Sequence, residues 1–251
     1  MELLPPGEVP APEFGRTWIN SSELALAALR GRVVLFDFWD YTCVNCLHTL
    51  PYIVEWDKRY REAGLTIIGV HAPEFPFARS ADFVRAAVAR FGIRYPVVLD
   101  NDFQIWRAFA NQYWPAKYLI DKDGFLRYMH FGEGNYAETE LAIQSLLRKI
   151  NSGIKLPAPL APLRDTDQLG ARCYRVTPEL YLGYQRGCIG NAGGFQRDAV
   201  ATYELPPKLE PDIFYARGPW LAGIEHLESA VQNSPESAAI VLLYTAKEVN
   251  L

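Results

Sequence analysis

The chain is short of the residue types that define several classes of protein. Its 251 residues contain only four cysteines and four histidines, too few and too irregularly spaced for a disulfide scaffold or a zinc site. The 25 Lys and Arg residues are outnumbered by 29 Asp and Glu residues, and this acidic balance argues against a nucleic-acid partner. No apolar run approaches the roughly 18 residues that a membrane span requires.

The first residues of the chain also lack the basic start and apolar stretch of a secretory signal. From the residues alone we therefore expect a soluble chain with no membrane span, cytoplasmic as it is written. Hydrophobic residues make up 49% of the sequence and the net charge is only −4, so the chain can bury a large core instead of staying disordered. No motif indicates a cofactor or a metal ion.

Segments typical of strands and helices alternate from residue 16 to residue 150. Residues 33–39 and 65–70 are continuous, largely apolar runs, as in buried parallel strands. Further strands are expected at 17–20, 95–99, 117–120 and 126–131, and helices from Ser21 or Ser22 to Leu29 and at 43–63, 80–91, 103–110 and 136–150. This order predicts an α/β sandwich with a mixed sheet.

The composition changes after residue 152. We predict a first domain over residues 1–152, a proline-rich, semi-rigid linker over 153–169 and a small all-β module over 170–251. The module offers few strands, expected at 220–227 and 239–245, and the last of them ends close to Leu251. Either the module is truncated, or its edge is covered by the first domain or by a second chain in a homodimer.

The chemistry is carried by Cys43 and Cys46, which are separated by two residues. The pair directly follows a buried strand and opens a helix, where unpaired backbone N–H groups and the helix dipole favour a thiolate at the first cysteine. Cys43, at the exposed start of the helix, is therefore the predicted nucleophile, and Cys46, one turn further in, is the predicted resolving thiol. The alternative is a pair of inert core cysteines.

Two other residues fit this chemistry. Asp37 interrupts the apolar strand, where a carboxylate is costly to bury, so it can lie beneath the cysteines and accept the proton of the resolving thiol. A carboxylate satisfied by the backbone or by Lys or Arg is the alternative reading of this residue. Pro115 precedes the strand expected at 117–120, whose start shares the sheet edge of Cys43 if the strand runs antiparallel to 33–39.

Taken together, the run from Phe36 to Trp39, the two cysteines, Pro51 in the helix and Trp114-Pro115 resemble the thioredoxin superfamily. The motifs at 41–46, 69–75, 113–121 and 131–134 are similar to its redoxin-like branch of the TlpA and ResA type. They resemble most of all the C-terminal region of DipZ-type thiol transporters and the thioredoxin-like part of NHL-repeat proteins. The resemblance covers about residues 16–150. Residues after 170 resemble, less specifically, the carbohydrate-binding-module-like domain of DipZ-type proteins.

The resemblance implies a thioredoxin-like three-layer sandwich and a thiol–disulfide oxidoreductase with a redox disulfide between Cys43 and Cys46. It places Asp37 in the buried-acid position and Pro115 as the cis-proline facing that disulfide. Substrate-binding residues are expected in Tyr41, Thr42 and Trp114. The implied partners are protein thiols and disulfides and an upstream redox donor, and the implied location is extracytoplasmic. Two departures stand out: Val44-Asn45 replaces the Gly-Pro of thioredoxin, and Thr49 stands where ResA-like proteins carry a glutamate.

Several alternatives stay open at this point. His71 and Glu74, at the end of the 65–70 strand, either form a rim beside Cys43 or belong to a plain connecting loop. Cys173 and Cys188 either pair in a structural disulfide or remain buried thiols. At the level of function, the chain can be a redoxin-derived scaffold or binding module with a glycan or protein ligand. A thiol peroxidase is a third reading, although Asp40 stands where such an enzyme needs a threonine.

Overall fold

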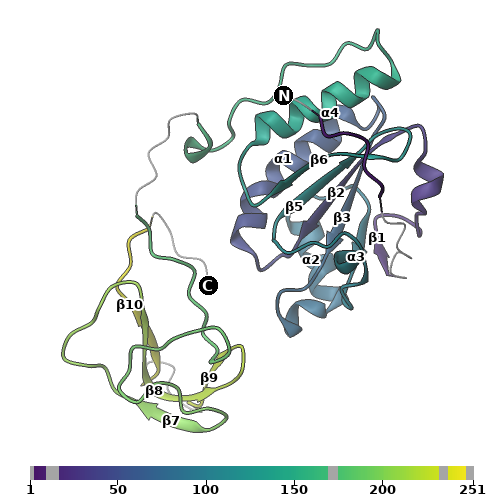
Figure 1. The fold of residues 1–251 in the computed structure, drawn as a ribbon. Coiled ribbons are helices and arrows are strands. Elements are labelled where there is room, and N and C mark those ends of the chain that lie inside the picture. The colour runs from purple at the N-terminus through teal and green to yellow at the C-terminus, as the bar shows by residue number, and fades with distance from the viewer. Residues whose placement is uncertain (1–2, 10–16, 169–174, 232–236, 247–251) are drawn as a thin grey trace. The chain divides into compact units, whose positions relative to one another are not determined.

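The computed structural model describes residues 3–9, 17–168, 175–231 and 237–246 (Figure 1). The chain divides into two compact units, Met1–Ala171 and Arg172–Leu251. The first unit holds the cysteine pair, and the second is a small sheet with its own core. No helix of the described residues is long and apolar enough to cross a membrane.

A six-stranded mixed sheet forms the centre of the first unit. Its order is β1-β4-β3-β2-β5-β6. The central strand β2 runs parallel to β3 and antiparallel to β5, so the sheet is mixed as the sequence predicts. The strands are β1 (Trp18–Ile19), β2 (Val33–Trp39), β3 (Leu65–His71), β4 (Val97–Leu99), β5 (Ala116–Ile120) and β6 (Leu126–Phe131).

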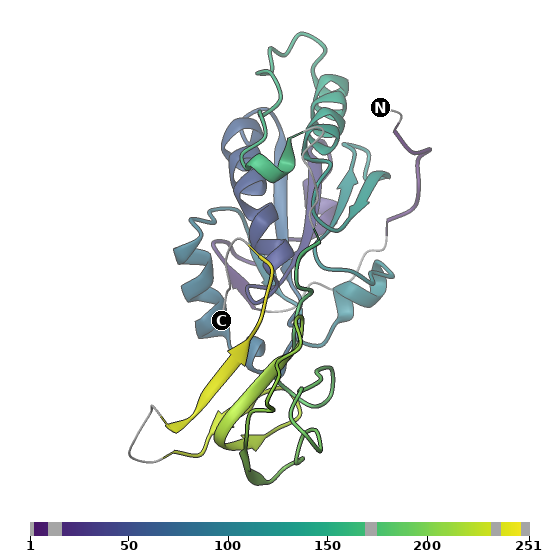
Figure 2. The same ribbon diagram turned by 90° about the vertical axis from the view of Figure 1, so that its left-hand side faces the viewer.

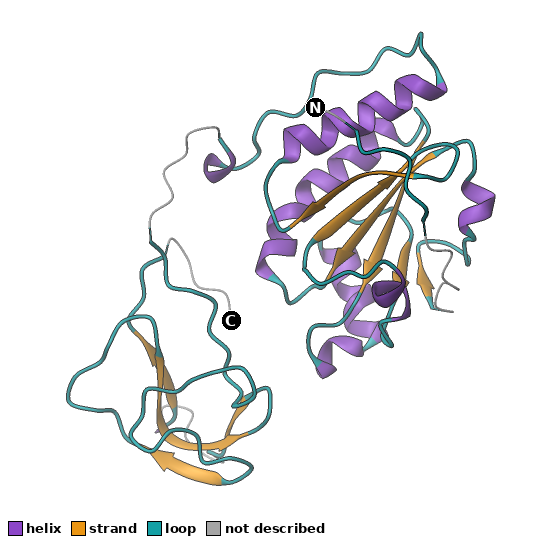
Figure 3. Ribbon diagram, in the orientation of Figure 1, coloured by secondary structure: helices purple, strands orange, loops and turns teal. Residues whose placement is uncertain are grey.

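Helices cover both faces of this sheet and make three layers (Figures 1 and 3). On one face lie α1 (Val44–Tyr60), α2 (Ala81–Arg90) and α4 (Tyr136–Ile150), whose apolar residues join one buried cluster. On the other face, η1 (Leu26–Leu29) and α3 (Gln104–Ala108) pack against a second cluster. A short turn of helix, η2 (Pro76–Arg79), precedes α2. The predicted three-layer sandwich is confirmed.

The alternation of side chains along β2 determines which face of the sheet Asp37 points to. Every residue of this strand is buried. Leu35 and Trp39 belong to the cluster beneath α1 and α4, whereas Phe36 and Phe38 belong to the cluster on the opposite face. Because successive side chains of a strand point to opposite faces, Asp37 faces the α1 side together with Leu35 and Trp39.

One helix prediction in this unit is wrong at its start. The sequence predicts a helix capped by Ser21 or Ser22, but the only regular element there is the single turn of η1, which begins after Ala25. Neither serine supplies a side-chain cap to it. The leucines of this segment instead pack singly against the sheet, so no sustained helical face forms.

The second unit is an antiparallel sheet, as an all-β module predicts. Strand β8 (Phe214–Ala222) pairs with β10 (Ala239–Leu242), β7 (Val200–Tyr203) and β9 (Leu227–Ser229). The prediction of one strand over 220–227 is wrong, because the chain turns at Gly223, whose N–H donates to the His226 carbonyl at 2.9 Å. Strand β7 was not predicted. Among the described strands, β10 pairs on one side only.

The proline-rich segment after α4 turns back beside the helices of the first unit (Figure 2), where hydrogen bonds hold it. The N–H of Leu160 donates to the Glu140 carboxylate at 2.7 Å, and the N–H of Leu163 donates to the Tyr52 hydroxyl at 2.7 Å. Tyr52 in turn donates to Asp167 at 2.8 Å. The described part of the predicted linker therefore runs across α4 and α1.

Candidate redox site

Both cysteines of the pair lie at the start of α1. Cys43 is the N-cap residue, with extended backbone, and its Sγ accepts the backbone N–H of Cys46 at 3.2 Å. Both are free thiols, with 6% of Cys43 and 1% of Cys46 exposed. The sequence predicts an exposed Cys43, and this is wrong in degree, because Tyr41 and Trp114 pack against the same cluster. The order of accessibility nevertheless favours attack by Cys43.

The inner thiol is held in its protonated form. Burial raises the pKa of Cys46 well above its ordinary value, and the hydrogen bond and charge of Cys43 raise it further. The backbone of Asp40 opposes this shift, whereas the charge of Asp37 adds to it. Cys46 therefore needs a proton acceptor before it can act as a nucleophile.

Asp37 lies on the α1 side of β2, only 1% exposed, and no described residue donates a hydrogen bond to its carboxylate. Burial raises its pKa to about 7, and the charge of Lys117 limits the rise. Its neighbours in the sheet are Gly69 on β3 and Lys117 on β5. A carboxyl group that titrates near neutral pH is suited to exchange protons with a thiol.

Lys117 is a site residue that the sequence reasoning missed. It is 0% exposed, and it lies opposite Asp37 in the antiparallel register of β2 and β5. A signal was available: a single lysine in the run of residues 116–120, two residues after Pro115 and at the start of the strand expected at 117–120. Complementary charges on two buried neighbouring strands indicate a pair.

A second buried carboxylate, Asp40, organises the loops around Cys43. It accepts the Glu74 N–H at 2.6 Å, the Thr42 hydroxyl at 2.9 Å and His71 Nε2 at 3.2 Å, together with the Thr42 N–H. Burial would raise the pKa of Asp40, but the hydrogen bonds and charge of His71 and the bonds from Glu74 and Thr42 outweigh it, so the pKa is lowered. Asp40 thus ties the turn before α1 to the loop after β3.

The other side of the site is formed by Trp114 and Pro115, whose peptide bond is cis. Ala116 pairs with Phe38 in the β2–β5 register, so Pro115 lies at the end of β2 from which α1 begins. The Pro115 carbonyl accepts the N–H of Gly132 at 2.8 Å. Trp114 Nε1 donates to the Ala72 carbonyl at 2.9 Å, which joins this segment to the loop after β3.

The predicted site residues therefore gather at one edge of the sheet, where β2 and β3 end and β5 begins. Tyr41 stacks on His71, with ring centroids 5.6 Å apart, and Thr42 and Glu74 are both bound to Asp40. Outside this edge, Cys188 is exposed, so its prediction as a buried thiol is wrong. Cys173 lies outside the described residues, and its pairing with Cys188 stays a prediction.

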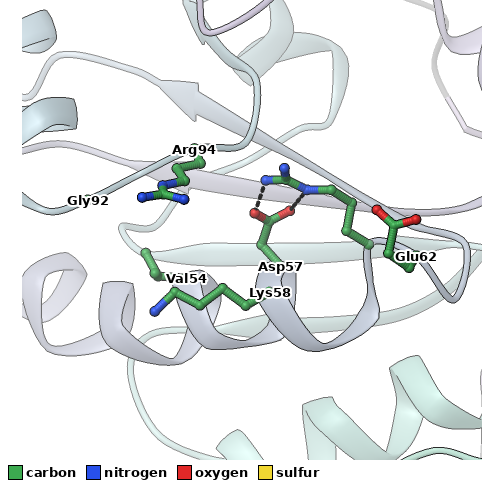
Figure 4. A pocket seen from close by; sticks show the side chains of 7 residues that line it. Val54, Asp57, Lys58, Glu62, Gly92 and Arg94 are labelled. Carbon is green, nitrogen blue, oxygen red and sulfur yellow. Dashed lines mark hydrogen bonds and ion pairs between the residues drawn. The ribbon is translucent and has the colours of Figure 1, made fainter.

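A shallow pocket on the same helix lies far from the cysteines (Figure 4). It is lined by residues of the last turns of α1 and the segment after α2: Val54, Asp57, Lys58, Arg61, Glu62, Gly92 and Arg94. Asp57 is 14 residues beyond Cys43, which is about 21 Å along a helix. The pocket therefore has no part in the redox site.

Comparison with known proteins agrees with this geometry. The AhpC/TSA family model matches residues 8–129, and the model of a thioredoxin like C-terminal domain matches residues 177–251. The thiol-disulfide oxidoreductase ResA of Bacillus anthracis is 31% identical over 140 residues, which cover 56% of this chain and 76% of ResA. The chain belongs to the thioredoxin superfamily. Within it, the chain is redoxin-like and DipZ-like, and it belongs to a family of thiol–disulfide oxidoreductases.

Two further similar proteins show how much of the chain each likeness covers. Protein DipZ of Mycobacterium tuberculosis is 39% identical over 235 residues, which cover 92% of this chain and 33% of DipZ. The chain thus spans about a third of the length of DipZ. The solution structure of a thioredoxin-like protein in its oxidised form is 28% identical with a TM-score of 0.52, covering 57% of this chain and 97% of that protein.

Proposed function

We propose that this chain exchanges disulfides with partner proteins through Cys43 and Cys46. One observation carries the proposal: Cys43 caps α1 with its sulfur on the Cys46 N–H, at the sheet edge where cis-Pro115 lies. The start of a helix stabilises a thiolate, which is the reactive form of cysteine. The membership of the oxidoreductase family supports the same activity.

The reaction proceeds in two balanced steps. The Cys43 thiolate attacks a partner disulfide, which forms a mixed disulfide and releases one partner thiolate. Cys46 then loses its proton to the Asp37 carboxylate and attacks the sulfur of Cys43, which forms the Cys43–Cys46 disulfide and releases the second partner thiolate. The partner gains two electrons and this chain loses two. An upstream dithiol donor reverses the sequence and restores the reduced pair.

We assign substrate binding to the rim around Cys43. Tyr41, Thr42 and Trp114 lie around the helix start, and Pro115 lies directly before β5 at the same end of the sheet. His71, at the end of β3, and Glu74, in the loop that follows, support the rim through Asp40. We place the protein outside the cytoplasm, following its DipZ-like and ResA-like character.

The test is turnover of insulin disulfides with dithiothreitol as the electron donor. Cys43→Ser should abolish turnover, and Cys46→Ser should accumulate mixed disulfides that mass spectrometry detects. Cys188→Ser, which removes an exposed thiol of the other unit, is the matched control and should leave turnover unchanged. Equal trapping by both site variants contradicts the assignment of roles, and a wild-type protein without turnover contradicts the function itself.

A further inference from the structure

The most unusual buried group of the first unit is the ammonium of Lys117. It stands two residues after Pro115 on β5 and is wholly shielded from solvent. Because Leu119, two residues further on, belongs to the cluster beneath α1 and α4, Lys117 faces the same side of the sheet as Asp37. A charged amine in such a place is strongly destabilising unless it is compensated.

Its compensation comes from the redox site itself. Burial lowers the pKa of Lys117, and the charges of Asp37, Cys46 and Glu133 oppose this effect. The single hydrogen bond found for its Nζ among the described residues is donated to the Gly132 carbonyl at 3.4 Å. Gly132 in turn donates to the carbonyl of Pro115. Lys117 is thus connected both to the proton-carrying residues and to the turn beside Pro115.

We propose that Lys117 is a positioning residue of the exchange reaction: its buried ammonium favours the ionised form of the Asp37 carboxylate, and its hydrogen bond to Gly132 holds the turn beside Pro115. This inference rests on the proposed function, because it concerns the proton that leaves Cys46 in the second step. Lys117 takes no part in sulfur transfer itself; it acts on the reaction through the Asp37 carboxylate.

The charge balance of the cluster supports this role. Burial opposes the ionisation of Asp37, and no described residue donates a hydrogen bond that would stabilise its carboxylate. The charge of Lys117 favours the ionised form. Without Lys117, the pKa of Asp37 would lie above about 7, and Cys46 would lose its proton acceptor at neutral pH. An opposite charge at close range typically lowers a carboxyl pKa by about 1–3 units.

Other titratable groups face this pair and must be considered in any pH profile. Cys46 approaches it from α1, and Tyr95, whose pKa is raised by burial and by the charge of Asp37, lies on the side of β4. From β6 and the loop after it, His130 and Glu133 interact with Lys117. Of these groups, His130 has its pKa lowered by burial and by the charge of Lys117, and its Nε2 donates to the Glu133 carbonyl at 3.3 Å.

The experiment resolves the two steps with an aryl disulfide, dithionitrobenzoate, in a Cys173→Ser/Cys188→Ser background. Attack by Cys43 releases the first thionitrobenzoate and attack by Cys46 releases the second, so stopped-flow absorbance separates the phases. Lys117→Met should move the inflection of the second phase to higher pH by at least about one unit, and slow that phase at least about 5-fold at pH 7. Lys117→Gln, which keeps a donor for Gly132, should show the same shift.

Two controls make the result specific to the buried pair. Lys122→Met removes a half-exposed lysine of the same hairpin and should leave both phases unchanged. In an Asp37→Asn background, Lys117→Met should no longer shift the inflection, because its target is gone. In this double variant neither Asp37 nor Lys117 remains as an uncompensated buried charge. It therefore also provides a folded protein if Lys117→Met alone is unstable.

The outcomes separate this inference from the proposed function. If the wild-type protein shows no second phase, disulfide exchange by the pair fails. If the wild type exchanges and both Lys117 variants keep its pH inflection, only the role of Lys117 is overturned. A shift of the first phase alone also overturns it, because that phase does not involve Asp37.

Discussion

The substitution Asp37→Asn should make the protein more stable while it slows disulfide exchange. Asn has the shape of Asp but carries no charge, so the variant behaves like wild type with Asp37 permanently protonated. Asp37 is fully buried without a hydrogen-bond donor among the described residues, and its folded-state pKa is raised by burial. Its ionisation therefore destabilises the folded state.

The magnitude follows from the two pKa values of Asp37. In the unfolded chain the carboxyl titrates at its ordinary value of 3.8, and in the folded state at about 7. The difference is 7 − 3.8 = 3.2 units, equivalent to about 4 kcal/mol at about 1.36 kcal/mol per unit. Because the folded state binds the proton more tightly, stability is complete below the lower pKa and is lost as the pH rises through the higher one.

The expected result is a gain in unfolding free energy that depends on pH. Asp37→Asn and wild type should be nearly equal at about pH 3, and the variant should be more stable by about 4 kcal/mol at about pH 8. The stabilised variant should nevertheless resolve mixed disulfides more slowly near neutral pH, because Cys46 has lost its proton acceptor.

Urea unfolding at a series of pH values measures this difference. Tryptophan fluorescence reports mainly the first unit, which contains every tryptophan except Trp220. Asp82→Asn is the matched control, since the Asp82 side chain is 90% exposed and its substitution should change stability little. A gain that is constant across pH, or a loss of stability at pH 8, would refute the burial argument. Unchanged exchange rates would leave Asp37 without a role in catalysis.

Three further predictions follow from the same structure. Asp40→Asn should destabilise the protein by about 3 kcal/mol at neutral pH, because an amide cannot accept the four hydrogen bonds that Asp40 now receives. Urea unfolding measures this loss, which should become smaller as acid protonates the wild-type carboxylate. Peroxide consumption with dithiothreitol should be slow relative to insulin reduction, since Asp40 fills the position where a peroxidase needs a hydroxyl; faster peroxide turnover would favour the peroxidase reading. Residues 172–251 expressed alone should dimerise or precipitate in light scattering, because β10 leaves one edge unpaired among the described strands; a soluble, cooperatively melting monomer would contradict this.

The first unit could be predicted closely because its central strands, β2 to β5, are buried on both faces. The run Val33–Trp39 is apolar except at Asp37, and it is strand β2 from end to end. Tyr136–Ile150 has a regular helical stripe, and it is α4 from end to end. In such elements the periodicity of the sequence and the packing of the fold demand the same residues.

The second unit was harder because its strands are short and partly exposed. Val200–Tyr203 alternates only weakly and was not predicted, since three of its four residues keep contact with solvent. Trp220 to Leu227 reads as one apolar stretch, yet the chain turns within it, and β8 instead begins at Phe214. Gly218, with φ of +86° in the middle of β8, lets this strand pair with β10 before it and with β7 after it.

In the candidate site, the sequence alone does not predict that Asp37 and Asp40, three residues apart, differ in their protonation. Asp37 lies inside β2, where the backbone N–H groups nearby are committed to the sheet, so its carboxylate finds no donor and burial dominates. Asp40 lies just past the end of β2, where the chain turns, and free N–H groups and His71 converge on it. The same side chain therefore holds a proton near neutral pH in one place and is firmly ionised in the other. What distinguishes them is whether the strand has ended, and a carboxylate inside an apolar strand next to a buried lysine is the pattern that we propose for the proton carrier.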